Sequence, residues 1–179
     1  MYTGGAALID SFRIYKKANA LVKRIGTRDT RQIANELGIK IYYESYDDLL
    51  GMYTYRWKQR IIFINNNLDD HMRQMVLAHE IGHDIFHRNL ASNGLKEFEL
   101  FDMKNTTEYE ANIFGSHLLI DNDEVLALAR DGYDIVQISR MLNSHINLLL
   151  IKMQEMNKMG YDFNVPYRPE GDFLKKIKV

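Results

Sequence analysis

Strand-forming residues followed at once by a long helical segment constrain the fold of this chain more than any other feature. Asp69 or Asp70 caps a helix that is expected to run to about His87, directly after the strongest strand signal in the sequence. Lys58-Gln59 predicts a hairpin between the last two strands. We therefore expect a small antiparallel or mixed sheet packed on this helix. The strand segments, short and rich in β-branched and aromatic residues, are 39–43, 52–57 and 60–65.

Helical spacing and cap signals predict helices on both sides of the sheet, and the cap signals are Asp29 with Gln32, Asp121 with Glu124 and Asp134 with Gln137. Residues 88–106 carry no such signal and are expected to form a loop. The order of helices, a small sheet and more helices is typical of an α+β domain. We expect one domain over residues 1–160, with its core at 28–120, and a tail over 161–179. The expected helices cover about 6–24, 30–37, 107–120, 121–131, 134–142 and 144–158.

Charge and composition exclude several classes of function. The chain has 23 basic and 24 acidic residues and a net charge of −1, so no strong global field attracts nucleic acid or anionic lipid. It has no cysteine, which excludes disulfides and thiolate metal sites. The apolar runs, such as Leu148 to Ile151, are far too short to span a bilayer, and the N-terminus lacks a secretory pattern. We expect a cytoplasmic protein without a membrane partner.

The motif His79-Glu80-Ile81-Gly82-His83 lies within the expected long helix. Residues four apart project from one helical face, so His79 and His83 can both reach one Zn²⁺ at roughly 2.0–2.1 Å. Glu80 lies about 100° round the helix, where it can take a proton from water at the metal. Gly82 is a poor helix former, and it predicts close approach by another element. The motif predicts one zinc ion per chain and Glu80 as the catalytic base.

A catalytic zinc usually takes a third protein ligand, and the histidine series does not supply it. From His79 to His87 is about 12 Å along a helix, so both cannot bind one ion. His87 is expected to be a packing residue or to support a ligand from outside the metal's own shell.

The helix expected at 107–120 is the remaining source of a ligand. Asn112 falls within about 40° of Glu108 on a helical wheel, whereas Glu110 points about 200° away and His117 lies opposite. We expect Glu108 to be the third ligand and Asn112 to accept a hydrogen bond from a ligand histidine. Glu110 is expected to form a capping box with Thr107, and His117 to lie away from the metal.

Three segments, one in the last expected strand, one in the long helix and one in the helix expected at 107–120, together resemble the ImmA/IrrE-type metallopeptidase family. The fold of that family is zincin-like. The third segment also parallels the gluzincin Glu-x-x-x-Asp element, with Asn112 in place of the aspartate. Two departures are Gly115, where the family usually has alanine, and Ile120-Asp121, where it has Met-Pro. The segments are Ile61-Ile62-Phe63-Ile64-Asn65, His79-Glu80-Ile81-Gly82-His83, and Glu108-Tyr109-Glu110-Ala111-Asn112-Ile113-Phe114 with Leu118-Leu119.

The resemblance implies a zinc endopeptidase of mobile elements, phages or stress responses that cleaves a helix-turn-helix repressor. It also implies a sheet edge beside the zinc helix to which an extended substrate pairs. We assign that edge to Ile61, Ile62, Phe63 and Ile64, or to the hairpin partner at 52–57.

Two other classes of function stay open. The first is a DNA-binding or repressor-binding regulator whose metal site is structural, and a structural zinc site requires four protein ligands. The second is a catalytically silent adaptor that binds the repressor without cutting it. Residues 134–142 and 144–158 have the spacing of a helix-turn-helix. Leu148 to Ile151, however, lie where a recognition helix presents polar side chains, so packing is the better interpretation.

Overall fold

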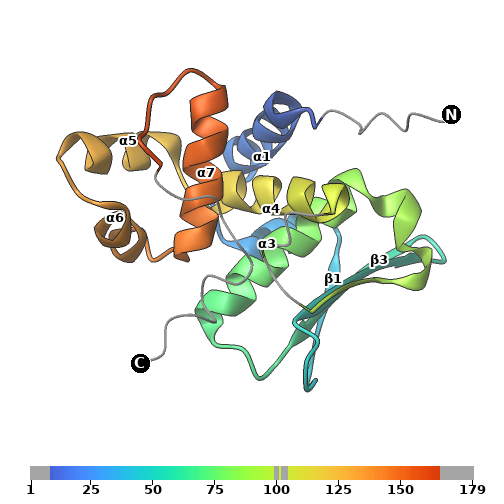
Figure 1. Ribbon diagram of the computed structural model, residues 1–179. Coiled ribbons are helices and arrows are strands. Elements are labelled where there is room, and N and C mark those ends of the chain that lie inside the picture. Colours follow the sequence, from blue (N-terminus) through green and yellow to red (C-terminus); the bar gives the residue numbers. More distant parts are fainter. Residues whose placement is uncertain (1–8, 99–100, 102–104, 166–179) are drawn as a thin grey trace, which may run out of the picture.

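A computed structural model describes residues 9–98, 101 and 105–165 of the chain. The expected helix start at 6–8 and the end of the expected tail, from 166 on, lie outside these residues. The chain folds as an α+β structure in which a four-stranded sheet lies on one side of α3 and most other helices on the other (Figure 1). The elements are α1 Ser11–Ile25, α2 Thr30–Glu36, β1 Lys40–Glu44, β2 Gly51–Arg56, β3 Gln59–Asn65, α3 Asp70–Phe86, the 3-10 helix η1 Arg88–Asn93, β4 Leu95–Glu97, α4 Thr106–Leu119, α5 Asn122–Arg130, α6 Ile135–Met141 and α7 Ile146–Lys158.

Four helices begin where an aspartate was expected to cap them. In each, the aspartate side chain accepts a hydrogen bond from a backbone N–H of the first turn, which satisfies a donor that the helix itself leaves unpaired. Asp134 and Gln137 form a complete capping box. The four caps are Asp29, Asp69, Asp121 and Asp134.

The sheet has the strand order β1-β3-β2-β4. β1 is parallel to β3, whereas β2 is antiparallel to both β3 and β4. The β2–β3 turn is Trp57-Lys58, one residue earlier than expected, and both residues have positive φ, at 50° and 61°. Such a mirror-image turn matches the right-handed twist of the two strands.

Of the two strands expected to form the sheet edge beside α3, one lies inside the sheet. Ile61 to Ile64 lie in β3, which pairs with β1 on one side and with β2 on the other, so its assignment as an edge strand is wrong. The alternative, β2, has its outer edge covered by β4 along Gly51–Tyr53. Farther along, the Thr54 hydroxyl donates to the Ala91 carbonyl of η1 at 3.2 Å.

The segment expected to be a loop at 88–106 contains two short elements, η1 and β4. β4 is only three residues long and exists because it pairs with β2, a partner more than forty positions earlier in the chain. No local pattern in the sequence encodes that pairing.

α3 and α4 cross at close range above the sheet, in the middle of the molecule (Figure 1). Gly82 makes the approach possible, as expected, because a Cβ built there would lie 3.0 Å from Cα and 3.2 Å from the carbonyl oxygen of Ala111. Gly115 of α4 faces Ala78 and the backbone of His79 with more room, 3.6 Å from the nearest atoms. Every residue of α3 from Met75 to Asp84 is buried.

α7 packs as a core helix against α4 and α6, which confirms that residues 148–151 are packing residues. Leu148, Leu149, Leu150 and Ile151 are all buried. Among the described residues, no helix is long and apolar enough to cross a membrane.

A buried basic pair joins α7 to α4. Lys152 is fully buried, and its ammonium donates to Nδ1 of His117 at 2.9 Å. Burial lowers the pKa of Lys152 to about 7, and burial likewise depresses the pKa of His117. His117 therefore lies in the core between α4 and α7, on the side of α4 away from His79 and His83.

Candidate metal centre

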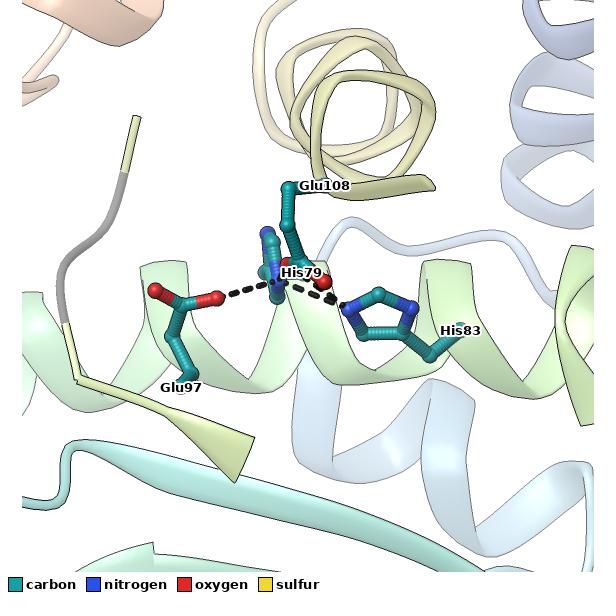
Figure 2. Close-up of side chains that lie close together, drawn as sticks. All are labelled: His79, His83, Glu97 and Glu108. Carbon is teal, nitrogen blue, oxygen red and sulfur yellow. Dashed lines mark hydrogen bonds and ion pairs between the residues drawn. The ribbon is translucent and has the colours of Figure 1, made fainter. Parts of the chain in front are cut away.

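His79 and His83 lie one turn apart on α3, and α4 brings Glu108 against them (Figure 2). The Nε2 atoms of the two histidines are 3.0 Å apart. Oε2 of Glu108 lies 3.0 Å from the first and 3.1 Å from the second. The structure therefore brings together the three residues that the helical wheel predicted as ligands, and their role as ligands remains a prediction.

The spacing of these three atoms suits a tetrahedral ion. Ligands about 2.0–2.1 Å from a tetrahedral centre lie about 3.3 Å from one another. The observed triangle, with sides of 3.0, 3.0 and 3.1 Å, is only slightly tighter. One ion of zinc's size would reach all three atoms with small movements of the side chains.

Asn112 fixes which nitrogen of His79 faces this triangle. Its Oδ1 accepts a hydrogen bond from Nδ1 of His79 at 2.9 Å, as predicted. With its proton on Nδ1, the neutral imidazole keeps a lone pair on Nε2, the atom that faces Glu108 and His83.

A second chain of hydrogen bonds fixes His83 in the same tautomer. Oε2 of Glu110 lies 2.9 Å from Nε2 of His87, and because a carboxylate only accepts, that nitrogen is the donor. Nδ1 of neutral His87 is then an acceptor, and it lies 2.9 Å from Nδ1 of His83. His83 therefore donates through Nδ1 and keeps its own lone pair on Nε2.

The role expected for Glu110 is thus wrong. α4 begins at Thr106 and is capped by Asn105, whose side chain accepts from the Thr107 amide. Thr107 is therefore inside the helix, and it cannot form the capping box. Glu110 instead holds His87, which is buried and supports His83, one of the two interpretations that the sequence left open for His87.

Three electron-pair donors thus converge in a buried site. Acceptors at such distances repel one another unless a positive charge lies among them. Burial lowers the pKa of His79, but hydrogen bonds with Glu108 and Glu97 outweigh it and raise the pKa to about 10. Burial lowers the pKa of His83 to about 4, although its hydrogen bond with Glu108 opposes this. The cluster therefore holds one positive charge, which is a proton on His79 when no metal is bound, and its donor set of two imidazoles and a carboxylate is one that zinc prefers.

Glu80 is fully buried beside this cluster. Neither of its carboxylate oxygens has a hydrogen-bond partner among the side-chain contacts of the described residues. Burial raises the pKa of Glu80 well above its usual value. Gly51 of β2 makes room for the carboxylate, since a Cβ there would lie 2.8 Å from Oε1 of Glu80. An unsatisfied buried carboxylate next to three ligand atoms fits a site that holds water or an ion.

Glu97 of β4 is the residue at the site that the sequence did not single out. Its Oε2 lies 3.0 Å from Nε2 of His79, and its side chain is almost completely buried. Together with His79, His83 and Glu108 it forms a group of four whose ligand atoms all lie within 4.8 Å of one another (Figure 2). It lay in the segment expected to be a loop, where no periodicity or motif distinguished it from other acidic residues.

A buried network holds α3 against the sheet below the site. The Tyr53 hydroxyl of β2 donates to Oδ1 of Asp84 at 2.8 Å, and Nε of Arg60 donates to the same oxygen at 2.7 Å. Arg60 also bonds the carbonyl of Leu37, at the end of α2. Because Asp84 directly follows His83, these contacts fix the position of α3 relative to β2 and β3.

Comparison with known proteins identifies the family. The model of the Peptidase_M78 family, described as the IrrE N-terminal-like domain, matches residues 34–165. This chain belongs to that family. The ImmA/IrrE-type resemblance inferred from the motifs is therefore confirmed, and so is the α+β fold that it implied. The match begins in α2 and ends after α7, so it includes the sheet, α3 with the His79–His83 motif, and α4.

One similar protein is a phage protein. It is "Uncharacterized immunity region protein 2" of Bacillus phage phi105, and it is 31% identical over 101 residues. The aligned region covers 56% of this chain and 63% of the phage protein. The aligned region thus spans less than two thirds of the length of this phage relative.

Proposed function

We propose that this IrrE-like chain is a zinc-dependent endopeptidase of regulatory function, which holds one zinc ion and cleaves a helix-turn-helix repressor. The observation that carries the proposal is the convergence of two imidazole lone pairs and a carboxylate beside the fully buried carboxylate of Glu80. Two imidazole nitrogens and a carboxylate oxygen buried this close together repel one another unless a positive charge lies between them, and a bound metal ion supplies that charge.

His79, His83 and Glu108 would hold the ion, and Asn112 and His87 would keep the two imidazoles in the tautomer and orientation that binding needs. Bound zinc supplies a Lewis acid, which polarises the scissile carbonyl and makes water more acidic. With three protein ligands, one position stays open for water and substrate, which is the arrangement of catalytic rather than structural zinc.

Glu80 would act as the general base and then as the general acid. It takes a proton from the water molecule whose oxygen forms the new bond to the carbonyl carbon. It then gives that proton to the amide nitrogen as the C–N bond breaks, so the products are a carboxylic acid and an amine. Burial raises the pKa of Glu80, and in its ionised form a carboxylate of higher pKa is a stronger base than an exposed one.

Family membership and the phage relative support a repressor as the substrate. The protein from phage phi105 is named for an immunity region, and a repressor is the substrate that the resemblance to the ImmA/IrrE-type family implies. A net charge of −1 suits a protein substrate better than direct binding to DNA. We place the protein in the cytoplasm, where such repressors bind DNA.

The proposal is tested by mixing the zinc-loaded protein with the helix-turn-helix repressor encoded beside it. We expect defined fragments of the repressor, no cleavage with chelator, and none with the Glu80→Gln variant. Casein serves as an unstructured control. If casein is degraded efficiently and the repressor survives, the protein is a general peptidase and the regulatory proposal is wrong.

The second candidate function is a repressor-binding regulator whose metal is structural. Glu97 favours it, because a fourth candidate ligand at the site provides the ligand number of a closed, structural zinc. The two functions are separated by the same mixture. A regulator of this kind would bind the repressor and leave it intact.

A further inference from the structure

Glu97 reaches the candidate metal centre from the sheet, whereas Glu108 reaches it from α4 (Figure 2). Its carboxylate lies 3.0 Å from Nε2 of His79, as close as the carboxylate of Glu108. An exposed acidic side chain near a histidine would be unremarkable. Glu97, however, is buried, and its carboxylate lies within 4.8 Å of the candidate ligand atoms of His79, His83 and Glu108, where a cation would lower the cost of burying its charge.

The backbone of β4 determines where this side chain points. Glu97 pairs with Gly51 of β2, and its carbonyl accepts a hydrogen bond from the Leu50 amide at 2.8 Å. Side chains alternate along a strand, so exposed Lys96 points away from the face that carries Glu97. Gly51 has no side chain that would separate Glu97 from Glu80 and the histidines.

We propose that Glu97 is a displaceable fourth ligand, which closes the metal site in the resting protein. This inference rests on the proposed function, because a ligand that blocks a site matters only if the site otherwise binds water and substrate. With Glu97 bound, four protein atoms surround the ion, and Glu80 has no water to deprotonate.

β4 also occupies the place that a substrate would take. Peptides commonly bind by adding a strand to a sheet edge, and the outer edge of β2 next to the histidines is the one that β4 covers. β4 thus lies like an extended peptide in the site, with a carboxylate at the metal in place of a scissile carbonyl. Opening the site then requires β4 to move, and both the edge of β2 and the fourth metal position become available together.

The short length of β4 makes such a movement feasible. It pairs with β2 over three residues only, and its other edge has no strand partner within the part of the chain that the structure describes. Short peripheral strands open at low free energy compared with global unfolding. A partner or substrate that binds the edge of β2 would therefore release Glu97, which makes activity depend on recognition.

The test uses the full chain loaded with Co²⁺, whose visible spectrum reports the coordination of the ion, and acetohydroxamate, a small ligand that needs an open position. Wild type should show little spectral change in millimolar acetohydroxamate. Glu97→Ala and Glu97→Gln should bind it at least tenfold more tightly. The matched control is Lys96→Ala, which alters the opposite face of β4 and should behave as wild type. In a chelator competition, both Glu97 variants should hold Zn²⁺ at least tenfold more weakly than wild type, yet still bind it.

The outcomes separate this inference from the proposed function. If wild type binds Co²⁺ and binds acetohydroxamate as readily as Glu97→Ala does, the site is open in the resting protein. The proposal that Glu97 closes it is then refuted, while the peptidase proposal stands. Unchanged zinc affinity in both Glu97 variants would likewise exclude Glu97 as a ligand. If wild type binds neither Co²⁺ nor Zn²⁺, the proposed function is wrong, and so is the proposal that Glu97 is a fourth ligand. A Glu97→Ala variant that does not fold leaves the Glu97→Gln comparison, which keeps the size of the side chain.

Discussion

Two glycines at the crossing of α3 and α4 should respond to the same substitution in opposite directions. Alanine in a helix interior is about 0.5–1 kcal/mol more favourable than glycine. At Gly115 the added methyl group would lie 3.6 Å from Ala78 and from the backbone of His79, which is ordinary contact. Gly115→Ala should therefore stabilise the protein by about 0.5–1 kcal/mol.

At Gly82 the same methyl group would meet Ala111 at 3.0 Å and 3.2 Å, and the ring of Phe114 at 3.2 Å. Two of these three atoms belong to the backbone of a buried helix, so they cannot rotate away. Overpacking of this kind costs about 1–3 kcal/mol, which exceeds the gain in helix propensity. Gly82→Ala should destabilise the protein by up to about 2 kcal/mol and, by pushing α4 away, weaken zinc binding through Glu108.

Thermal denaturation of the metal-free variants measures the effects on stability, and a chelator competition measures the effect on zinc binding. For a chain of this size, 1 kcal/mol corresponds to a shift in Tm of about 2–4 °C. If Gly82→Ala stabilises the protein as much as Gly115→Ala, α4 is not held against α3 as described. The geometry of Glu108 and Asn112 would then need revision.

Three further predictions concern single side chains. Glu80→Gln should keep the fold and the zinc but abolish proteolysis, because an amide cannot accept the proton of water; cleavage at the wild-type rate would remove Glu80 as the base. Asn112→Ala should weaken zinc binding roughly 10–100-fold and His87→Ala by a similar factor, since each substitution frees a ligand imidazole to rotate. Equal zinc affinity of wild type and both variants in a chelator titration would contradict this. Burial lowers the pKa of Lys152 to about 7, so between about pH 7 and pH 10.4 the unfolded chain binds a proton that the folded chain does not, and stability rises with pH over that range. Lys152→Met lacks this dependence, so its free energy of unfolding relative to wild type should fall as the pH is raised from 7 to 10. A difference in free energy of unfolding that stays constant over this range would show that the pKa of Lys152 is not lowered.

Features set by local sequence were predictable. An aspartate before an apolar periodic segment satisfies backbone donors within its own turn, and Asp69, Asp121 and Asp134 cap helices as expected. The helical wheel also placed Glu108 and Asn112 toward His79 correctly, because one narrow stripe of α4 determines what faces α3.

Features that depend on distant pairing were not. β4 forms only against β2, so neither its existence nor the position of Glu97 follows from residues near it in the chain. The contact of Glu110 with His87 joins residues 23 positions apart, and a local cap was the simpler interpretation. The error over β3 had a usable signal, however. Ile61 to Ile64 are four apolar residues in succession, whereas exposed edge strands commonly carry charged residues that prevent pairing with other chains.

The metal content of the purified protein tests the central claim most directly. Elemental analysis should find about one zinc ion per wild-type chain, and none held tightly by His83→Ala or Glu108→Ala, because each lacks one of three ligands. His71→Ala is the matched control, since this histidine lies on the same helix outside the cluster and its loss should leave the zinc unchanged. Wild type without zinc, or full zinc in both ligand variants, would contradict the assignment of the site.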